Sequence, residues 1–435
     1  MKKHLLLITG GFPFGEIERG FLPIEFQRLT GEFQVSVLSW CGRDVPLLYS
    51  FPSDIPVRRV KSIWQDPKSL LWLLTVPFRP FVVWEIFQAV RREVLQAVRD
   101  CTVKTALLRI HSIVLYYFSA LRNVPLLRRI VKEDKIDLIY TYWCLVPTLA
   151  AVLLKKYVPE LKVITRFHGY DLYRERSPIG LQPFRQEISH GCDLLIFAAE
   201  MGKKYYLETW GTCWASKSFV SYLGSRALSV VSPRTQKNSL TLVSCSNMIP
   251  LKRIHLIVDA LRLLPEDVCV YWHHIGDGES RAALTEQAET ALNPLPNVQW
   301  KFWGFVPNGA LDRLYQEIQP DIFITTTSTE GGVPVSIQEV FSVSVPAIAT
   351  AVGGVPEIVR DGETGFLLLA DPSAQETAGA IQRFYELNAA EKKAMSEAAR
   401  ALWTEKFDAK KNAVSLVEQI KNSCGYLNEK GARII

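Results

Sequence analysis

The stretch that decides the fold of the C-terminal half is TTTSTEGGVPVSIQEVFSVSVPAIATAVGGVPEIVRDGETGFLLL, residues 325–369. An apolar strand ends in the threonines, and a loop, Glu330–Gly332, turns into a helix with Pro334 in its first turn. Backbone N–H groups at a helix start behind glycines suit a diphosphate. Glu339, about five residues into this helix, can accept hydrogen bonds from paired hydroxyls, as on a ribose. The alternatives are a turn residue for Glu330 and a solvated helix residue for Glu339.

The whole chain alternates apolar, β-branched runs with helical patterns, which predicts parallel sheets covered by helices. At 435 residues it exceeds the size of one hydrophobic core, so we expect two doubly wound domains. Ligands of such sheets bind beyond the carboxyl ends of the strands. The predicted strands are His4–Thr9, Val35–Leu38, Leu138–Tyr142, Lys162–Phe167, Leu194–Ala198, Leu240–Cys245, Cys269–Ile275, Val298–Trp303, Ile322–Thr325 and Ala347–Ala351.

Periodicity is lost over Ser218–Arg234, which predicts a linker there. We therefore expect an N-terminal domain over residues 1–225 and a C-terminal domain over residues 236–405. A last helix, about residues 406–435, can pack back on the first domain.

The composition is that of an ordinary globular protein. Eight cysteines are scattered without a C-x-x-C pair, which is typical of cytosolic thiols. The apolar run Leu5–Ile8 is too short for a signal peptide, and no run of 18 or more uncharged apolar residues occurs. These features predict a cytoplasmic protein.

The region from Trp64 to Lys132 differs from the rest of the chain. An apolar part, Leu70–Ile86, precedes helices that are rich in cations and poor in acids. These helices are either core-facing with solvated basic faces, or they form a patch that binds an anionic membrane surface from the cytoplasmic side. The cations are Arg91, Arg92, Arg99, Lys104, Arg109, Arg122, Arg128, Arg129 and Lys132.

A second site element is VSCSNMIPLKRIHLIVDALR, residues 243–262, in which a strand leads through a proline turn into an amphipathic helix. Lys252 and Arg253 stand in this turn, where two cations would neutralise a diphosphate leaving group. The alternative for Lys252 is an exposed surface lysine.

The N-terminal half contributes two further elements. In TRFHGYDL, residues 165–172, His168 follows a strand and can hydrogen-bond a sugar hydroxyl, although a lone histidine is more often structural. Asp171 is either a helix cap or a group that contacts the acceptor. The loop GGFPFGEIERG, residues 10–20, is glycine-rich but lacks the dinucleotide fingerprint G-x-G-x-x-G. It is either a phosphate and acceptor loop or a turn with a helix cap.

Together these segments resemble the retaining glycosyltransferases of family 4, which have the GT-B fold. Glu339 matches the second of two family glutamates that are separated by seven residues, and Glu330 lies one position before the place of the first. Gly353, Gly354 and Glu357 match a later Gly-Gly-x-x-Glu turn. Lys252 matches the family's lysine, whereas Ser246 and Asn247 replace its glycine and its frequent arginine. His168, Gly169 and Asp171 match an N-domain motif.

The resemblance implies roles for residues by position. Catalytic roles fall to His168, Glu330 and Lys252. Donor binding falls to Glu339, Lys252, Arg253, Asn247, Gly331, Gly332, Val333, Pro334, Gly304 and Phe305. Acceptor or cleft contacts fall to Gly10, Gly11, Gly15, Glu18, Arg19 and Asp171.

The resemblance further implies a GT-B architecture, with two Rossmann-like domains facing a central cleft. The implied reaction transfers a sugar with retention from a nucleoside diphosphate sugar to a glycan or lipid-linked glycan, in synthesis of a bacterial-type surface polysaccharide. No metal or other cofactor is expected, and no D-x-D pair occurs. A sugar-nucleotide epimerase or hydrolase and a non-catalytic partner in a membrane assembly are the alternatives. We expect no nucleic-acid partner.

Overall fold

The structure is a computed structural model that describes residues 2–15, 18, 20–41, 45–49, 52, 54–60, 80–98, 102–229 and 239–426. The chain divides into two compact units. The N-terminal unit comprises Met1–Ser221 together with Ala413–Ile435, and the C-terminal unit comprises Tyr222–Asn412. The first segment of the N-terminal unit thus ends at Ser221, four residues before the predicted end of the N-terminal domain at residue 225.

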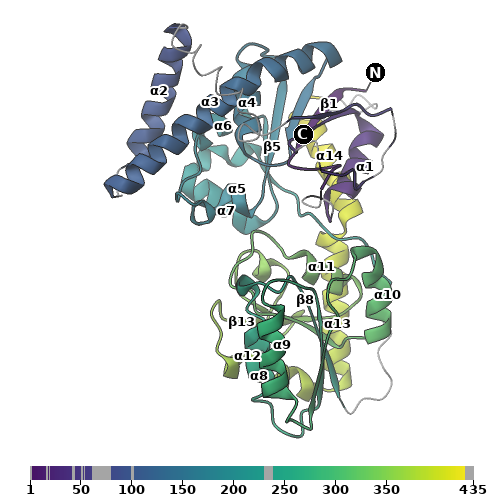
Figure 1. The fold of residues 1–435 in the computed structure, drawn as a ribbon. Coiled ribbons are helices and arrows are strands. Elements are labelled where there is room, and N and C mark those ends of the chain that lie inside the picture. The colour runs from purple at the N-terminus through teal and green to yellow at the C-terminus, as the bar shows by residue number, and fades with distance from the viewer. Residues whose placement is uncertain are drawn as a thin grey trace. The chain divides into compact units, whose positions relative to one another are not determined.

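The N-terminal unit, which contains β1 and β5 in Figure 1, is built on a parallel sheet. This sheet has seven strands in the order β3-β2-β1-β4-β5-β6-β7. The central strands are buried along their length, which explains why they read as continuous apolar runs. The strands are β1 His4–Thr9, β2 Gln34–Ser39, β3 Val57–Arg59, β4 Leu138–Thr141, β5 Lys162–Phe167, β6 Leu194–Phe197 and β7 Ser218–Val220.

Helices cover this sheet. The longest is α3, 32 residues, which packs against both α2 and α4. The helices are α1 Leu22–Glu32, α2 Pro80–Ala97, α3 Val103–Asp134, α4 Val146–Lys155, α5 Gly169–Leu172, α6 Arg185–Gly191 and α7 Glu200–Trp210. The C-terminal helix α14, Ala409–Ser423, reaches this unit, where Lys421 forms an ion pair with Glu32.

The C-terminal unit has a six-stranded parallel sheet in the order β10-β9-β8-β11-β12-β13. Its strands are β8 Leu240–Cys245, β9 Val270–Ile275, β10 Val298–Phe302, β11 Ile322–Thr325, β12 Ala347–Thr350 and β13 Gly365–Leu368. Its helices are α8 His255–Leu261, α9 Arg281–Leu292, α10 Asn308–Ile318, α11 Val335–Ser342, α12 Ala374–Glu386 and α13 Ala389–Leu402, with a π-helical turn at Trp403–Phe407.

Every predicted strand is present, with ends within one residue of those predicted. The short strands β3, β7 and β13 were not predicted. β7 occupies the start of the predicted linker, so Ser218–Val220 belongs to the N-terminal sheet instead. Of the predicted apolar segment Leu70–Ile86, residues 70–79 lie outside the described residues.

In each sheet the strand order reverses at one switch point. This point lies between β1 and β4 in the N-terminal unit and between β8 and β11 in the C-terminal unit. Loops at the carboxyl ends of strands flanking such a switch point separate and leave a crevice for a ligand. The loops after β1, β4, β8 and β11 are therefore the places to look for a site. No helix among the described residues has the length and apolar character needed to cross a bilayer.

Candidate functional site

At the switch point of the C-terminal sheet, Lys252 and Glu330 form an ion pair. Lys252 ends the short 3-10 helix η5, Pro250–Lys252, after β8, and Glu330 lies in the loop after β11. The Lys252 Nζ atom donates to Glu330 Oε1 at 2.5 Å, and both side chains are mostly buried. Two residues predicted independently, 78 positions apart, thus meet. An ammonium has three N–H donors, so this bond leaves capacity for a second anionic group.

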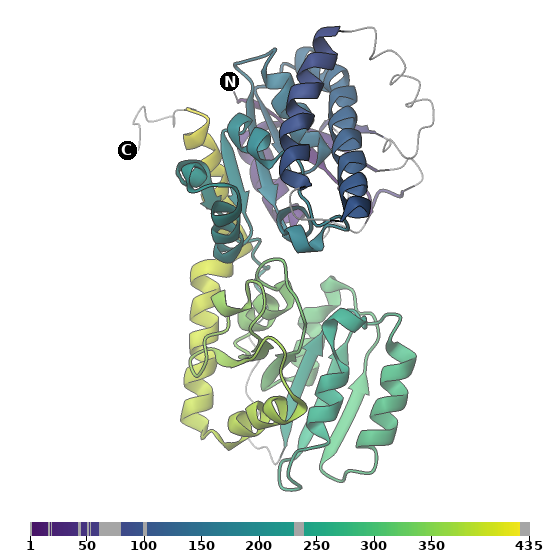
Figure 2. The same cartoon turned by 90° about the vertical axis from the view of Figure 1, so that its left-hand side faces the viewer.

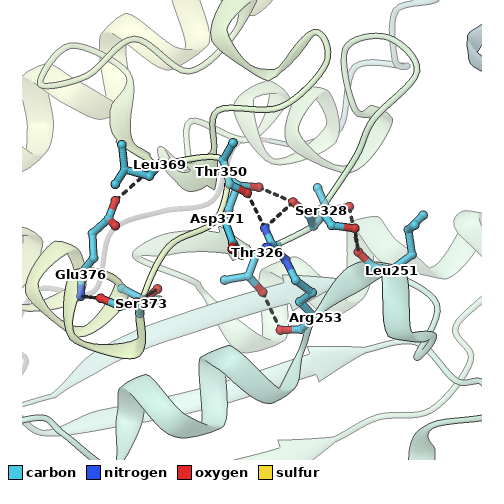
Figure 3. Close-up of polar contacts among 12 residues, drawn as sticks. Leu251, Arg253, Thr326, Ser328, Thr350, Leu369, Asp371, Ser373 and Glu376 are labelled. Atoms are coloured by element: carbon cyan, nitrogen blue, oxygen red, sulfur yellow. Dashed lines mark hydrogen bonds and ion pairs between the residues drawn. The ribbon is translucent and has the colours of Figure 1, made fainter. Parts of the chain in front are cut away.

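Main-chain contacts fix the two loops that carry this pair. The backbone N–H and the hydroxyl of Ser328 both donate to the carbonyl oxygen of Leu251, at 2.9 and 3.1 Å. The Thr326 hydroxyl donates to the carbonyl oxygen of Arg253 at 2.9 Å. The loop after β8 is therefore fastened to the loop after β11 on both sides of Lys252 (Figure 3).

Arg253 joins the carboxyl ends of three strands. Its guanidinium donates to the carbonyl oxygens of Thr326, Thr327 and Ala370 at 2.7, 3.1 and 2.8 Å, and to Asp371 at 2.7 Å (Figure 3). Its backbone is left-handed, with φ 47°. We predicted that Arg253 contacts the donor diphosphate, but four of its five N–H donors are engaged by the protein. Its observed role is structural, because it holds the edge on which Lys252 stands.

The glycine loop and α11 form the other wall of this site. Pro334 is the N-cap residue, one position earlier than predicted, and no side chain caps the helix. The first N–H groups of α11 thus lack an intrahelical partner. Gly353, with φ 52°, packs so closely that a Cβ there would lie 2.1 Å from the Glu330 carbonyl oxygen. The backbone N–H of Gly354 donates to the carbonyl oxygen of Gly332 at 3.2 Å. The turn at residues 353–354 therefore braces the loop of Glu330.

Glu339 is the fifth residue of α11, as the sequence predicted to within a residue. Burial raises its pKa to about 7, and the nearby Arg226 opposes this shift. The Glu339 carboxylate in turn contributes to raising the pKa values of Cys245 and Tyr315, so these side chains lie near it. A carboxyl with a pKa near neutrality in such a cluster is typical of a ligand-binding group.

The remaining predicted donor residues lie along the same edge of the sheet. Asn247 is exposed in the loop after β8, and Val333 is buried beside Pro334. Gly304, with φ 70°, accepts from the backbone N–H of Gly276 at 2.9 Å, which ties the loop after β10 to that after β9. Phe305 next to it is 75% exposed.

In the N-terminal unit, the loop after β1 is organised around Glu18. This side chain is fully buried. Its Oε1 accepts from the backbone N–H of Gly10 at 2.6 Å, and its Oε2 accepts from those of Gly11 and Phe12 at 2.9 and 2.7 Å. The indole N–H of Trp143, after β4, donates to Oε1 at 2.8 Å. We predicted an acceptor contact for Glu18, but its oxygens are committed to the protein.

His168 lies against Trp143, with ring centroids 4.3 Å apart. Its Nε2 is 3.1 Å from the carbonyl oxygen of Tyr142. Because a carbonyl only accepts, Nε2 carries the proton and Nδ1 is the acceptor. Burial and the charge of Arg166 lower the pKa of His168 to about 3, so the ring is neutral. His168 can accept a hydrogen bond from a hydroxyl but is a weak base.

Asp171 is fully buried and acts as a cap. Its Oδ1 accepts from the backbone N–H of His168 and its Oδ2 from that of Cys144, each at 2.6 Å. Burial raises its pKa to about 7. Of the two roles open from the sequence, the structure shows the helix cap, and the predicted acceptor contact is not available to it. Gly15 has a left-handed φ of 68°, and Arg19 lies outside the described residues.

Sequence reasoning missed two residues of these sites. Trp143 links Glu18 to His168, and its position directly after β4 at the switch point was the signal that would have revealed it. Arg226 affects Glu339 from a segment assigned to the linker, where no signal marked it. Within the described ranges, no three His, Cys, Asp or Glu side chains gather as metal ligands do.

Comparisons with known proteins find similarity to glycosyltransferases. Residues 228–402 match the family model of glycosyl transferases group 1. A Salmonella typhimurium protein provisionally named colanic acid biosynthesis glycosyltransferase WcaL is 24% identical over 249 residues, 55% of this chain and 59% of that protein. The chain thus spans about three fifths of this relative's length. The amylovoran biosynthesis glycosyltransferase AmsK of Erwinia amylovora is 26% identical over 149 residues, 33% of this chain and 35% of that protein.

Solved structures share the fold over nearly the whole chain. A glycosyltransferase from Rickettsia africae has a TM-score of 0.66 at 17% identity and covers 97% of this chain and 98% of its own. Anabaena HepE in complex with UDP has a TM-score of 0.63 at 18% identity and covers 96% and 99%. The two units thus have the α/β architecture of GT-B proteins, and residues 228–402 match the model of the glycosyl transferases group 1 family.

Proposed function

We propose that this protein is a retaining, metal-independent glycosyltransferase that moves a sugar from a nucleoside diphosphate sugar to a glycan or lipid-linked glycan acceptor in bacterial surface polysaccharide synthesis. The observation that carries this proposal is the Lys252–Glu330 pair beside the uncapped start of α11, at a switch point of a family-matched unit. The relatives named for colanic acid and amylovoran biosynthesis support the polysaccharide context.

The donor binds at the carboxyl edge of the C-terminal sheet. Lys252 and the first N–H groups of α11 hold the diphosphate, and Glu339 accepts from the ribose hydroxyls. The cation and the helix start stabilise the charge that grows on the leaving diphosphate. No metal ion is needed in this scheme.

The acceptor binds on the side of the N-terminal unit, where His168 Nδ1 accepts from a sugar hydroxyl. The bond between the sugar anomeric carbon and the diphosphate breaks, and the acceptor oxygen bonds to the same face of that carbon. The acceptor proton passes to the departing phosphate oxygen. A neutral histidine with a pKa near 3 fits this scheme, because the protein then has to position the reactants and does not remove the proton.

The direct test is a binding screen over nucleoside diphosphate sugars, followed by product analysis with a lipid-pyrophosphate glycan as acceptor. We expect product only when the acceptor is present, an unchanged anomeric configuration by NMR, and full activity in EDTA. Donor conversion without acceptor would identify an epimerase or hydrolase instead. Failure to bind any donor would indicate a non-catalytic assembly partner.

Replacing Lys252 with Ala should lower kcat/KM by about 30- to 1000-fold, roughly 2–4 kcal/mol, because one donor to the departing charge is lost. Steady-state kinetics measure this effect. Lys393→Ala is the matched control, since Lys393 is an exposed lysine on α13 of the same unit, and it should leave kcat/KM unchanged. Equal losses in the two variants would contradict the assignment.

Donor affinity should fall as the pH drops through 7, because only the ionised Glu339 accepts from both ribose hydroxyls. Between pH 8.5 and 5.5 the ionised fraction falls roughly thirtyfold, which bounds the loss of affinity. The diphosphate of a nucleotide sugar does not titrate in this range, and Cys245, with a pKa of about 12, stays neutral. Calorimetry at several pH values measures the effect.

The Glu339→Gln variant is the control for this pH dependence. It should bind the donor more weakly and without a slope near pH 7. The stability of the protein without donor should change with pH in the opposite direction. The neutral Glu339 carboxyl stabilises the fold below pH 4.5, and this stabilisation is lost as the pH rises through 7. The same slope in both proteins would show that another group titrates.

Replacing Glu18 with Ala should leave the N–H donors of Gly10, Gly11, Phe12 and Trp143 without their acceptor. Each costs about 1–3 kcal/mol, so hydrogen exchange at Gly10, Gly11 and Phe12 should accelerate at least roughly a hundredfold. Exchange measured by mass spectrometry checks this locally. Glu208→Ala, on the exposed face of α7, is the control. Unchanged protection of residues 10–12 would mean that Glu18 does not organise the loop.

A further inference from the structure

The helices α2 and α3 form a hairpin at the periphery of the N-terminal unit (Figures 1 and 2). One face of this hairpin is firmly packed. Ala89 and Glu93 of α2 and Ile113 of α3 are buried. Arg92 forms an ion pair with Glu187 of α6 at 3.2 Å, which ties α2 to the body of the unit. The position of the hairpin is thus set by specific contacts.

The opposite face gathers exposed apolar side chains at the end where α2 meets α3. Leu95 in the last turn of α2 is 53% exposed, and Val103, Leu107 and Leu108 in the first two turns of α3 are 79%, 63% and 52% exposed. Scattered exposed leucines are normal, but a cluster on one end of a helical hairpin marks an interaction surface.

Among the described residues around this apolar end, the exposed charged side chains are positive. Among residues 87–98 and 102–112 the acid is Glu93, and its side chain is buried. Arg91, Arg92 and Lys104 are exposed. An apolar face flanked by cations complements a lipid surface that carries negative headgroups, whereas a soluble protein partner would call for mixed charges.

We propose that the end of the α2–α3 hairpin, formed by Leu95, Val103, Leu107 and Leu108 with Arg91 and Lys104, docks on an anionic phospholipid bilayer and places the leucines among the headgroups. This inference deepens the proposed function, because it names the surface at which a lipid-linked acceptor is met. The Arg109 guanidinium donates to the carbonyl oxygen of Ile179 at 2.9 Å, which fastens this part of α3 to the segment that follows α5.

The surface differs from the basic patch that the sequence suggested. Arg128 and Arg129 lie near the other end of α3, 24 residues or more beyond Lys104. At 1.5 Å per residue, this separates them from the hairpin end by roughly 36 Å. One flat bilayer contact at the hairpin end does not need them, so the two groups of cations can be separated by experiment.

The test is co-sedimentation of the full chain with vesicles of about 70% phosphatidylcholine and about 30% phosphatidylglycerol, which have a negatively charged surface. We expect binding that weakens in pure phosphatidylcholine and in high salt. Leu107→Ser with Leu108→Ser should weaken binding at least roughly tenfold, because two apolar side chains leave the interface. Leu95→Ser and Lys104→Glu should each weaken it further.

Two controls separate this surface from others. Leu369→Ser removes a similarly exposed leucine, 67% exposed, from the C-terminal unit and should bind vesicles like the unchanged protein. Arg128→Glu with Arg129→Glu should also retain most of the binding. Circular dichroism confirms that each variant is folded. Because vesicle binding needs neither donor nor acceptor, its outcome is independent of whether the chain transfers a sugar.

The proposal is overturned if the Leu107 and Leu108 variants bind as well as the unchanged protein, or if the Arg128 and Arg129 variant alone loses binding. It is also overturned if the chain does not co-sediment with anionic vesicles and the leucine substitutions instead convert a dimer to a monomer in analytical ultracentrifugation. That result would assign the hairpin end to a second copy of the chain.

Discussion

The ion pair between Lys252 and Glu330 holds the candidate donor site together, because it joins the loops after β8 and β11 at the switch point of the C-terminal sheet. A parallel sheet opens at such a point, and its loops would otherwise diverge. The guanidinium of Arg253 holds the strand ends behind the pair. The start of α11 and the Lys252 ammonium are thereby presented from a fixed framework, as electrostatic stabilisation of a leaving group requires.

In the N-terminal unit the loops across the switch point are joined by hydrogen bonds instead of an ion pair. Glu18 in the loop after β1 is bonded to Trp143 after β4, across the corresponding switch point. In each unit a glutamate therefore ties the loop after the first strand of its sheet to the loop across the switch. In the N-terminal unit the partners are backbone and indole N–H groups, and the bonded Trp143 packs on a neutral His168. The Glu18 carboxylate therefore positions the loop after β1 and Trp143, because its oxygens are bonded to them.

The strands and the site loops could be predicted from the sequence because apolar periodicity and glycine–proline turns are local signals. The individual roles could not, because they depend on partners distant in the chain. Arg253 looked equivalent to Lys252, yet its guanidinium donates to carbonyl oxygens that follow β11 and β13. Glu18 looked like a ligand of an acceptor and Asp171 like either such a ligand or a helix cap, and both accept from backbone N–H groups. Strand β7 is three residues long and had no periodicity to detect.

A crystal structure with a bound nucleoside diphosphate would show whether Lys252 and the first N–H groups of α11 bind one diphosphate. We expect phosphate oxygens within hydrogen-bonding distance of both Lys252 Nζ and the backbone N–H groups that follow Pro334, with the ribose hydroxyls on Glu339. A diphosphate bound at another edge of the C-terminal sheet, with the Lys252–Glu330 pair untouched, would contradict this expectation.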